Sequence, residues 1–167
     1  MSTTGGPHLP IETERLLLRY FEPGDIDVLA AMHGDPDLVR WIPWGPRTRE
    51  QAAEVLERKL TCRTIESEGD GLGIAPVLRE TGEMIGDFTL QYVSEEHSVA
   101  ELGYLLTAGT QGRGYATEAS REILRLAFDG TVKDSYLFNL TYQTTLAGPY
   151  DPRADRDVFL ISTGVKL

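Results

Sequence analysis

The amino-acid sequence predicts a single-domain α/β fold. A length of 167 residues is typical of one domain, and a chain of this length buries roughly 70% of the surface that it exposes when unfolded. Segments typical of strands and of amphipathic helices follow one another along the chain, and no linker separates them. The apolar fraction of 41% and the charged fraction of 25% are ordinary for a soluble globular protein. These observations exclude a disordered, collagen-like or disulfide-framed chain.

The charge and the apolar runs narrow the classes of partner. With 26 acidic and 16 basic residues the net charge is −10, and no stretch is densely basic, so we expect no nucleic-acid partner. Such a charge is typical of a soluble acidic surface, and it also favours a cationic or amine-bearing partner. The apolar runs are far shorter than the ~18 residues that span a bilayer, so we expect no membrane partner. Cys62 is the single cysteine, which excludes an internal disulfide and favours the cytoplasm.

The first part of the chain contains one predicted strand and two short helices. The apolar run Leu16–Leu18 predicts the strand, and the helices begin at Asp25 and at Asp35, which is followed by proline. The expected elements are a flexible tail over residues 1–9, a strand over Leu9–Phe21, a helix from Asp25 to Met32 and a helix from Asp35 to Pro43.

The middle of the chain predicts a helix followed by three strands. Thr48 and Gln51 have the spacing of a capping box, and apolar residues recur behind them at helical spacing. The segment Glu80–Glu83 has the composition of a hairpin turn. The expected elements are a helix over about Arg49–Ile65 and strands over Leu72–Glu80, Met84–Val93 and Ser98–Thr107.

The last part of the chain predicts one amphipathic helix, followed by two strands with weaker patterns. From Gly114 onward apolar residues share one helical stripe, and Asp129-Gly130 should end that helix. Two further strands are expected, over Val132–Tyr142 and Val158–Ile161, with a loop between them.

The segment from Glu101 to Ala119 is the one that indicates chemistry. An apolar strand runs through a glycine-bearing loop directly into an amphipathic helix. The first N–H groups of a helix lack partners within the helix and lie at the positive end of its dipole, so they bind anions, phosphate above all. Gly112 and Gly114 have no Cβ, which lets successive amides approach such an anion. The alternative is that both glycines only make a tight turn between strand and helix.

Two common phosphate motifs do not fit this loop. A P-loop needs lysine and then serine or threonine after its last glycine, where this chain has Tyr115 and Ala116. A dinucleotide fingerprint would need glycine in place of Thr117. The pattern Gln/Arg-x-x-Gly-x-Gly/Ala is met in full by Gln111, Gly114 and Ala116.

With this pattern the sequence resembles the GNAT superfamily of N-acetyltransferases, in particular its branch of ribosomal-protein N-terminal acetyltransferases. The opening strand of that branch is similar to Thr13–Arg19, and the resemblance extends from Pro10 to Phe128. It implies a mixed, mostly antiparallel sheet flanked by helices, formed by residues 10–167. It also implies transfer of the acetyl group of acetyl-CoA to an amine, with no metal. The residues that it places at the coenzyme are Leu105, Leu106, Thr107, Gln111, Gly112, Arg113, Gly114, Tyr115, Ala116 and Thr117.

The resemblance further implies how the reaction proceeds. A protonated amine must lose a proton before it attacks, so a general base is needed, either directly or through water. Glu101 is our candidate base, and a solvated strand glutamate is the alternative. A backbone N–H of Leu105 or Leu106 would hold the oxyanion. Trp41 and Trp44 would either enclose the acceptor or pack between helix and sheet.

The chain departs from the family after the coenzyme helix. Residues 131–167 are atypical, which indicates a shortened or rearranged C-terminal part, and an open sheet edge there would favour a homodimer. Ser135, Tyr136 and Tyr142 remain candidates for the general acid. A protein N-terminus is the leading acceptor and a small-molecule amine is the second. The alternative from another class is a catalytically degenerate module that binds acyl-CoA or acts as a scaffold.

Overall fold

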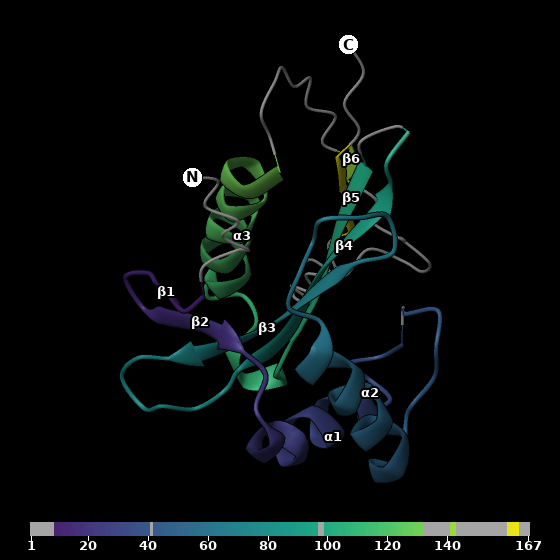
Figure 1. The fold of residues 1–167 in the computed structure, drawn as a ribbon. Helices are drawn as coiled ribbons and strands as arrows, with labels where there is room; N and C mark the ends of the chain where they lie inside the picture. The colour runs from purple at the N-terminus through teal and green to yellow at the C-terminus, as the bar shows by residue number, and fades with distance from the viewer. Residues whose placement is uncertain (1–8, 41, 97–98, 132–140, 143–159, 164–167) are drawn as a thin grey trace.

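A computed structural model of the chain describes residues 9–40, 42–96, 99–131, 141–142 and 160–163, with side chains described as far as residue 126. One sheet forms its centre, in the order β1-β2-β3-β4-β5-β7-β6 (Figure 1). The strands are β1 (Ile11–Glu12), β2 (Leu16–Tyr20), β3 (Gly71–Leu78), β4 (Gly86–Ser94), β5 (Val99–Leu106), β6 (Thr141–Tyr142) and β7 (Leu160–Thr163). The helices are α1 (Ile26–Gly34), α2 (Arg49–Thr61) and α3 (Tyr115–Thr131), with short 3-10 turns at Pro23–Asp25 and Ala108–Thr110.

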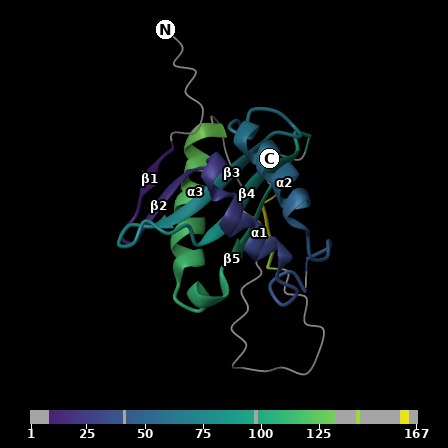
Figure 2. The same ribbon diagram turned by 90° about the horizontal axis from the view of Figure 1, so that it is seen from below.

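The predicted fold class is confirmed. Every strand pair within the described ranges is antiparallel, in agreement with a mostly antiparallel sheet, and no parallel pair occurs among these strands. Helix α3 covers one face of the sheet, and α1 and α2 cover the other (Figures 1 and 2).

Strand alternation divides the buried side chains into two cores. Leu102, Tyr104 and Leu106 of β5 point to the α3 side, where they pack with residues of β2, β3, β4 and α3. Leu105 points to the other side, where it joins the core that α1 and α2 form with the sheet. The same alternation therefore places Glu101 and Gly103 on the α1–α2 face.

The hairpin and the capping box are confirmed. Gly82 has φ +75° in the turn between β3 and β4, and the Leu78 amide donates to the Glu83 carbonyl at 2.8 Å. At the start of α2 the Gln51 amide donates to the Thr48 hydroxyl at 3.3 Å, and the Thr48 amide donates to the Gln51 side chain at 2.9 Å.

Three of the predicted elements differ from the structure. The expected single strand over 9–21 is divided into β1 and β2, because the Thr13 amide donates to the Leu16 carbonyl and the Leu16 amide donates to the Thr13 hydroxyl, which closes a turn. The helix expected to reach Ile65 ends at Thr61, because the Cys62 carbonyl accepts a hydrogen bond from Gly73 at the start of β3. The helix that we predicted to begin at Asp35 does not form.

The Asp35 segment forms isolated turns instead of a helix. The Asp35 carboxylate accepts from the Asp37 amide at 2.9 Å and from the Leu38 amide at 3.4 Å, which are bonds of a helix cap, but no helix follows them. One bond of helical spacing follows, from the Val39 amide to the Asp35 carbonyl, and it is not continued.

The predictions for the chain ends lie mostly outside the described residues. This holds for the tail over residues 1–8 and for all but Thr141 and Tyr142 of the strand over 132–142. The strand predicted at 158–161 corresponds to β7, which begins at Leu160 and pairs with β5. Helix α3 ends at Thr131, one residue beyond the predicted stop.

Candidate functional site

The loop between β5 and α3 has the backbone conformation that its glycines predict. Gly112 has φ +70° and Gly114 has φ +78°, a region that residues with a Cβ rarely adopt. Both glycines are exposed, and Ala116 is buried in the first turn of α3 against the core. The loop is therefore a sharp turn that ends at an accessible helix N-terminus.

The amides of this loop are available to a ligand. Among the described residues, no acceptor is found for the backbone N–H groups of residues 114–117, which end the loop and begin α3. The carbonyls on either side are occupied: Leu106 accepts from the Gln111 side chain at 3.2 Å, and Arg113 accepts from Arg15 at 2.9 Å. Open donors, engaged acceptors and a helix dipole together form an anion site that fits a pyrophosphate.

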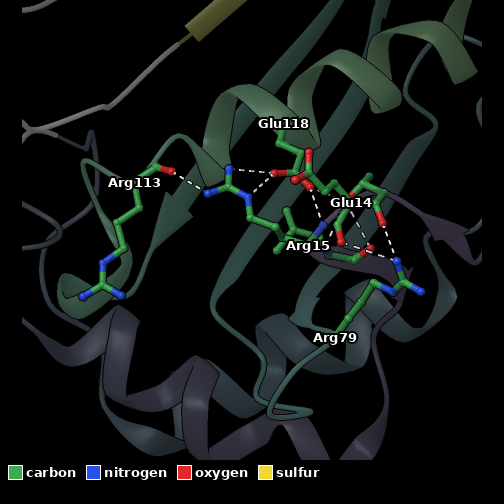
Figure 3. Close-up of polar contacts among 7 residues, drawn as sticks. Glu14, Arg15, Arg79, Arg113 and Glu118 are labelled. Carbon is green, nitrogen blue, oxygen red and sulfur yellow. Dashed lines mark hydrogen bonds and ion pairs between the residues drawn. The ribbon is translucent and has the colours of Figure 1, made fainter.

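A polar cluster holds this loop against the N-terminal strands (Figure 3). Arg15 precedes β2 and forms an ion pair of 2.7 Å with Glu118 in the first turn of α3. The Arg15 amide and the Thr13 hydroxyl also donate to Glu118. The Arg15 guanidinium lies 4.4 Å from the centre of the Tyr115 ring and bonds the Arg113 carbonyl, while the Arg113 side chain extends away from the pair. We name Arg15 and Glu118 the loop clamp.

The loop clamp keeps Glu118 ionised. Desolvation alone would raise the pKa of Glu118, but the hydrogen bonds from Thr13 and from the Arg15 amide and guanidinium outweigh it, and the pKa lies below its ordinary value. Both clamp residues lie in segments singled out in the sequence, Thr13–Arg19 and Glu101–Ala119, but the sequence assigned a role to neither. Their separation of 103 residues leaves no local signal of the contact.

The edge of β5 that leads into the loop is only partly covered. Strand β7 pairs with β5 over Ala100–Gly103, and no strand of the described part pairs with the same edge beyond Gly103. The Thr107 amide donates toward β4, to the Ile85 carbonyl at 2.9 Å, so the backbone of the preceding residue, Leu106, faces the open edge. Of the two amides proposed for the oxyanion, the Leu106 N–H is therefore the one at the open edge, whereas Leu105 faces β4.

Glu101 lies on the α1–α2 face of the same strand. It is partly buried and is paired in register with Gln91 of β4 and Ser162 of β7. A Cβ added at Gly103, the next position on this face, would meet no atom of the described residues within 4 Å. No described atom therefore fills the position above Gly103, which lies between Glu101 and Leu105, about 13 Å further along the strand.

The predicted acceptor residues lie between α1 and α2. Trp41 lies outside the described residues. Trp44 is partly buried, with its ring centre 4.7 Å from that of His33 and 3.6 Å from the Arg47 guanidinium carbon. One side of the indole thus packs onto polar groups of this segment. Of the general-acid candidates, Ser135 and Tyr136 are not described, and Tyr142 is described in its backbone only.

Sequence reasoning missed a buried polar cluster on this face. Asp87 of β4 is 8% exposed and pairs with Lys59 of α2 at 2.6 Å and with His33 of α1 at 2.9 Å. Lys59 also donates to Thr89 at 2.6 Å. In register Asp87 lies opposite Leu105. The available signal was a charged residue next to the apolar Phe88 in the predicted strand.

The Asp87 carboxylate remains charged in this cluster. Desolvation by burial would raise the pKa of Asp87, but the charge of Lys59 and the hydrogen bond to His33 offset it and lower the pKa below its ordinary value.

The described ranges contain no group of three or more histidine, cysteine, aspartate or glutamate side chains arranged to hold a metal ion. Within the same ranges no helix combines the length and the apolar character that crossing a bilayer requires.

Comparison with curated proteins finds relatives named N-acetyltransferases. The chain is 30% identical over 116 residues to the uncharacterized N-acetyltransferase p20 of Bacillus licheniformis, covering 70% of this chain and 64% of p20. It is 31% identical over 119 residues to the uncharacterized N-acetyltransferase YnaD of Bacillus subtilis (strain 168), covering 71% and 65%. The chain thus spans just under two thirds of the length of these relatives.

Comparison with solved structures finds the same fold. An acetyltransferase of the GNAT family from Bacillus anthracis matches with a TM-score of 0.62 and 24% identity, over 71% of this chain and 66% of that one. A Vibrio cholerae protein, provisionally named a ribosomal-protein-serine acetyltransferase, matches with a TM-score of 0.60 and 18% identity, over 96% and 99%. At these identities the likeness shows the fold alone. The model of the acetyltransferase (GNAT) domain family matches residues 15–145, which include β2, the glycine turn and α3, and the chain therefore belongs to the GNAT acetyltransferase family.

Proposed function

We propose that the protein is an N-acetyltransferase that moves the acetyl group of acetyl-CoA to an amine. The observation that carries this proposal is the group of open amides at residues 114–117, directly beyond the part of β5 that no described strand pairs with. Membership of the GNAT family supports it.

The chain's own residues suit the two parts of the coenzyme. The amides of the glycine turn and the dipole of α3 would hold the pyrophosphate, with Thr117 in the first helical turn. The open edge of β5 would take the pantetheine arm as an added strand along Leu105–Thr107. When bound, the coenzyme supplies an acetyl thioester that is reactive toward an unprotonated amine.

Two groups on β5 serve the chemistry. Glu101 is the general base that removes a proton from the acceptor amine. Its distance from Leu105 exceeds the reach of one side chain, so we infer a water between base and amine, in the open space above Gly103. The Leu106 N–H, at the open edge, donates to the acyl oxygen as negative charge develops there.

A protein N-terminus is the leading acceptor, and a small-molecule amine is the second. The segment Thr13–Arg19, which resembles the ribosomal-protein branch, supports the first, as does the Vibrio cholerae neighbour, which matches over 96% of this chain. The single cysteine supports a cytoplasmic location.

Release of free thiol from acetyl-CoA, measured with a panel of peptides and small amines, tests the proposal. Glu101→Gln should lower kcat at least a hundredfold, since general-base catalysis contributes about 10²–10⁴-fold. Glu95→Gln is the matched control, because Glu95 is exposed on the turn between β4 and β5. Tight binding of acetyl-CoA without turnover on any amine would instead support the degenerate binding module.

A further inference from the structure

Arg47 lies on the α1–α2 side of the sheet and is connected by two hydrogen bonds to β4, the neighbour of the proposed coenzyme strand β5. Its guanidinium Nη1 lies 3.0 Å from His33 Nδ1, and His33 Nε2 lies 2.9 Å from the Asp87 carboxylate. Asp87 in turn lies opposite Leu105 in the register of β4 and β5. Arg47 therefore lies on the same side of the sheet as Glu101 and Gly103.

The chemistry of the donors fixes the state of His33. A guanidinium has hydrogen-bond donors only, so His33 Nδ1 must accept from Arg47 and carries no proton. Nε2 then donates to Asp87. The imidazole orients Arg47 but brings no negative charge to it.

The charge of Arg47 has no anionic partner in the described part of the chain. Asp87 is neutralised by Lys59 at 2.6 Å, and no described carboxylate forms an ion pair with the Arg47 guanidinium. Desolvation and then the nearby Arg58 lower the pKa of Arg47, and Asp87 offsets this only in part. An arginine stays charged at neutral pH all the same, so its cation is destabilised where it lies and an anion would relieve this.

Arg47 is also held in place, and most of its guanidinium N–H donors remain available. Its guanidinium lies over the Trp44 ring at 3.6 Å, and its backbone amide donates to the His33 carbonyl at 2.9 Å. Of its five N–H donors, the bond to His33 uses one. The remaining donors can receive a carboxylate in the paired geometry that arginine favours.

We propose that Arg47 binds a carboxylate of the acceptor, so that the preferred substrate carries a carboxylate close to its amine. The inference rests on the acetyl transfer proposed above and makes Arg47 a specificity-determining residue. His33, Asp87 and Trp44 are positioning residues that orient it. The carboxylate belongs either to a free amino acid or to an acidic side chain near a peptide N-terminus.

Matched acceptor pairs measure this preference. Serine against serinamide tests a free amino acid, and a hexapeptide that begins Ser-Asp against one that begins Ser-Asn tests a peptide. We expect kcat/KM to favour the acidic member of at least one pair by tenfold or more, as a hydrogen bond to a charged group allows, and the pair that discriminates identifies the source of the carboxylate. Equal kcat/KM within both pairs would overturn the proposal.

Variants assign the preference to Arg47. Arg47→Gln should reduce it to about twofold by raising KM for the acidic acceptor while KM for acetyl-CoA is unchanged, and Arg47→Lys should restore it in part. Arg49→Gln removes the same charge from an exposed residue that pairs with Asp27, and it should keep the preference. A rise in KM for acetyl-CoA in Arg47→Gln would overturn the proposal by assigning Arg47 to the coenzyme.

A binding measurement separates this proposal from the enzymatic one. If no amine is acetylated, the proposed function fails. Calorimetric titration with the Ser-Asp peptide then tests separately whether Arg47 binds a carboxylate. Affinity that falls at least tenfold in Arg47→Gln but not in Arg49→Gln supports the carboxylate site. Absence of binding by the wild-type protein, or equal affinity of both variants, refutes it.

Discussion

Replacing Asp87 by asparagine leaves the ammonium group of Lys59 without its counter-charge in a buried site. The two side chains are only about a tenth exposed, at 10% for Lys59 and 9% for Asp87, so solvent does little to compensate the loss. Breaking a buried pair on one side costs about 3–5 kcal/mol. We take the lower end, about 3 kcal/mol, because the Thr89 hydroxyl still accepts from Lys59. For a chain of this size that corresponds to a fall in Tm of roughly 6–12 °C.

Urea unfolding at neutral pH, followed by circular dichroism, measures this loss. Asp27→Asn provides the control, since it breaks an ion pair that is 79% exposed on the aspartate side and should change the unfolding free energy by less than about 0.5 kcal/mol. In the double variant Lys59→Met/Asp87→Asn the loss should be smaller than the sum of the single losses. A loss below about 1 kcal/mol in Asp87→Asn would refute the reasoning.

The same variant has a predicted pH dependence. Because folding lowers the pKa of Asp87, its carboxylate stabilises the folded state above the unfolded pKa of about 3.9 and loses this effect as the pH falls through the lower folded value. The difference in unfolding free energy between wild type and Asp87→Asn should therefore narrow below about pH 3.9. A difference that stays constant into acid would show that the lost charge is not its origin.

Three further changes test the loop and the helix that supports the acceptor side. Gly114→Val should weaken coenzyme A binding in calorimetry at least tenfold, whereas Gly82→Val, which strains a glycine of similar φ in a distant hairpin, should leave it unchanged; equal affinities would contradict the anion site. Glu118→Gln removes the charge that holds Arg15 and should weaken coenzyme A binding severalfold, and full affinity would show that the loop holds its shape without the clamp. Thr48→Ala should cost about 1 kcal/mol in urea unfolding with coenzyme A affinity retained, and a loss of affinity would show that α2 contributes to the coenzyme site.

Local chemistry made much of the fold predictable. The capping box at Thr48, the hairpin glycine at Gly82 and the amphipathic stripe after Gly114 each act within a few residues, and each element formed where its signal lies. The errors arose where a local signal met a competing contact. Asp35 has the residue type of a helix cap, but its carboxylate closes an isolated turn, and the end of α2 is fixed by a backbone bond to β3.

The candidate site also has a part that the sequence predicted and a part that it did not. The glycine turn could be predicted because positive φ is a property of single residues, Gly112 and Gly114. The loop clamp and the Asp87 cluster could not, because their partners are separated by 103 residues for Arg15–Glu118 and 54 for His33–Asp87. Spacing along the chain carries no information about such pairs until the strand register is known.

The loop clamp couples the N-terminal strands β1 and β2 to the glycine turn between β5 and α3, where coenzyme binding is proposed. Thr13 and Arg15 hold the first turn of α3 and the Arg113 carbonyl, so fraying of the N-terminal hairpin would release the loop that the anion needs. Ligand binding at the loop and order in β1 and β2 are then thermodynamically linked. A bound ligand stabilises the ordered strands, and the ordered strands raise the affinity for the ligand. If the glycine turn binds the coenzyme as proposed, a nick or deletion ahead of Leu16 should lower coenzyme affinity, although it removes no residue of the proposed coenzyme site.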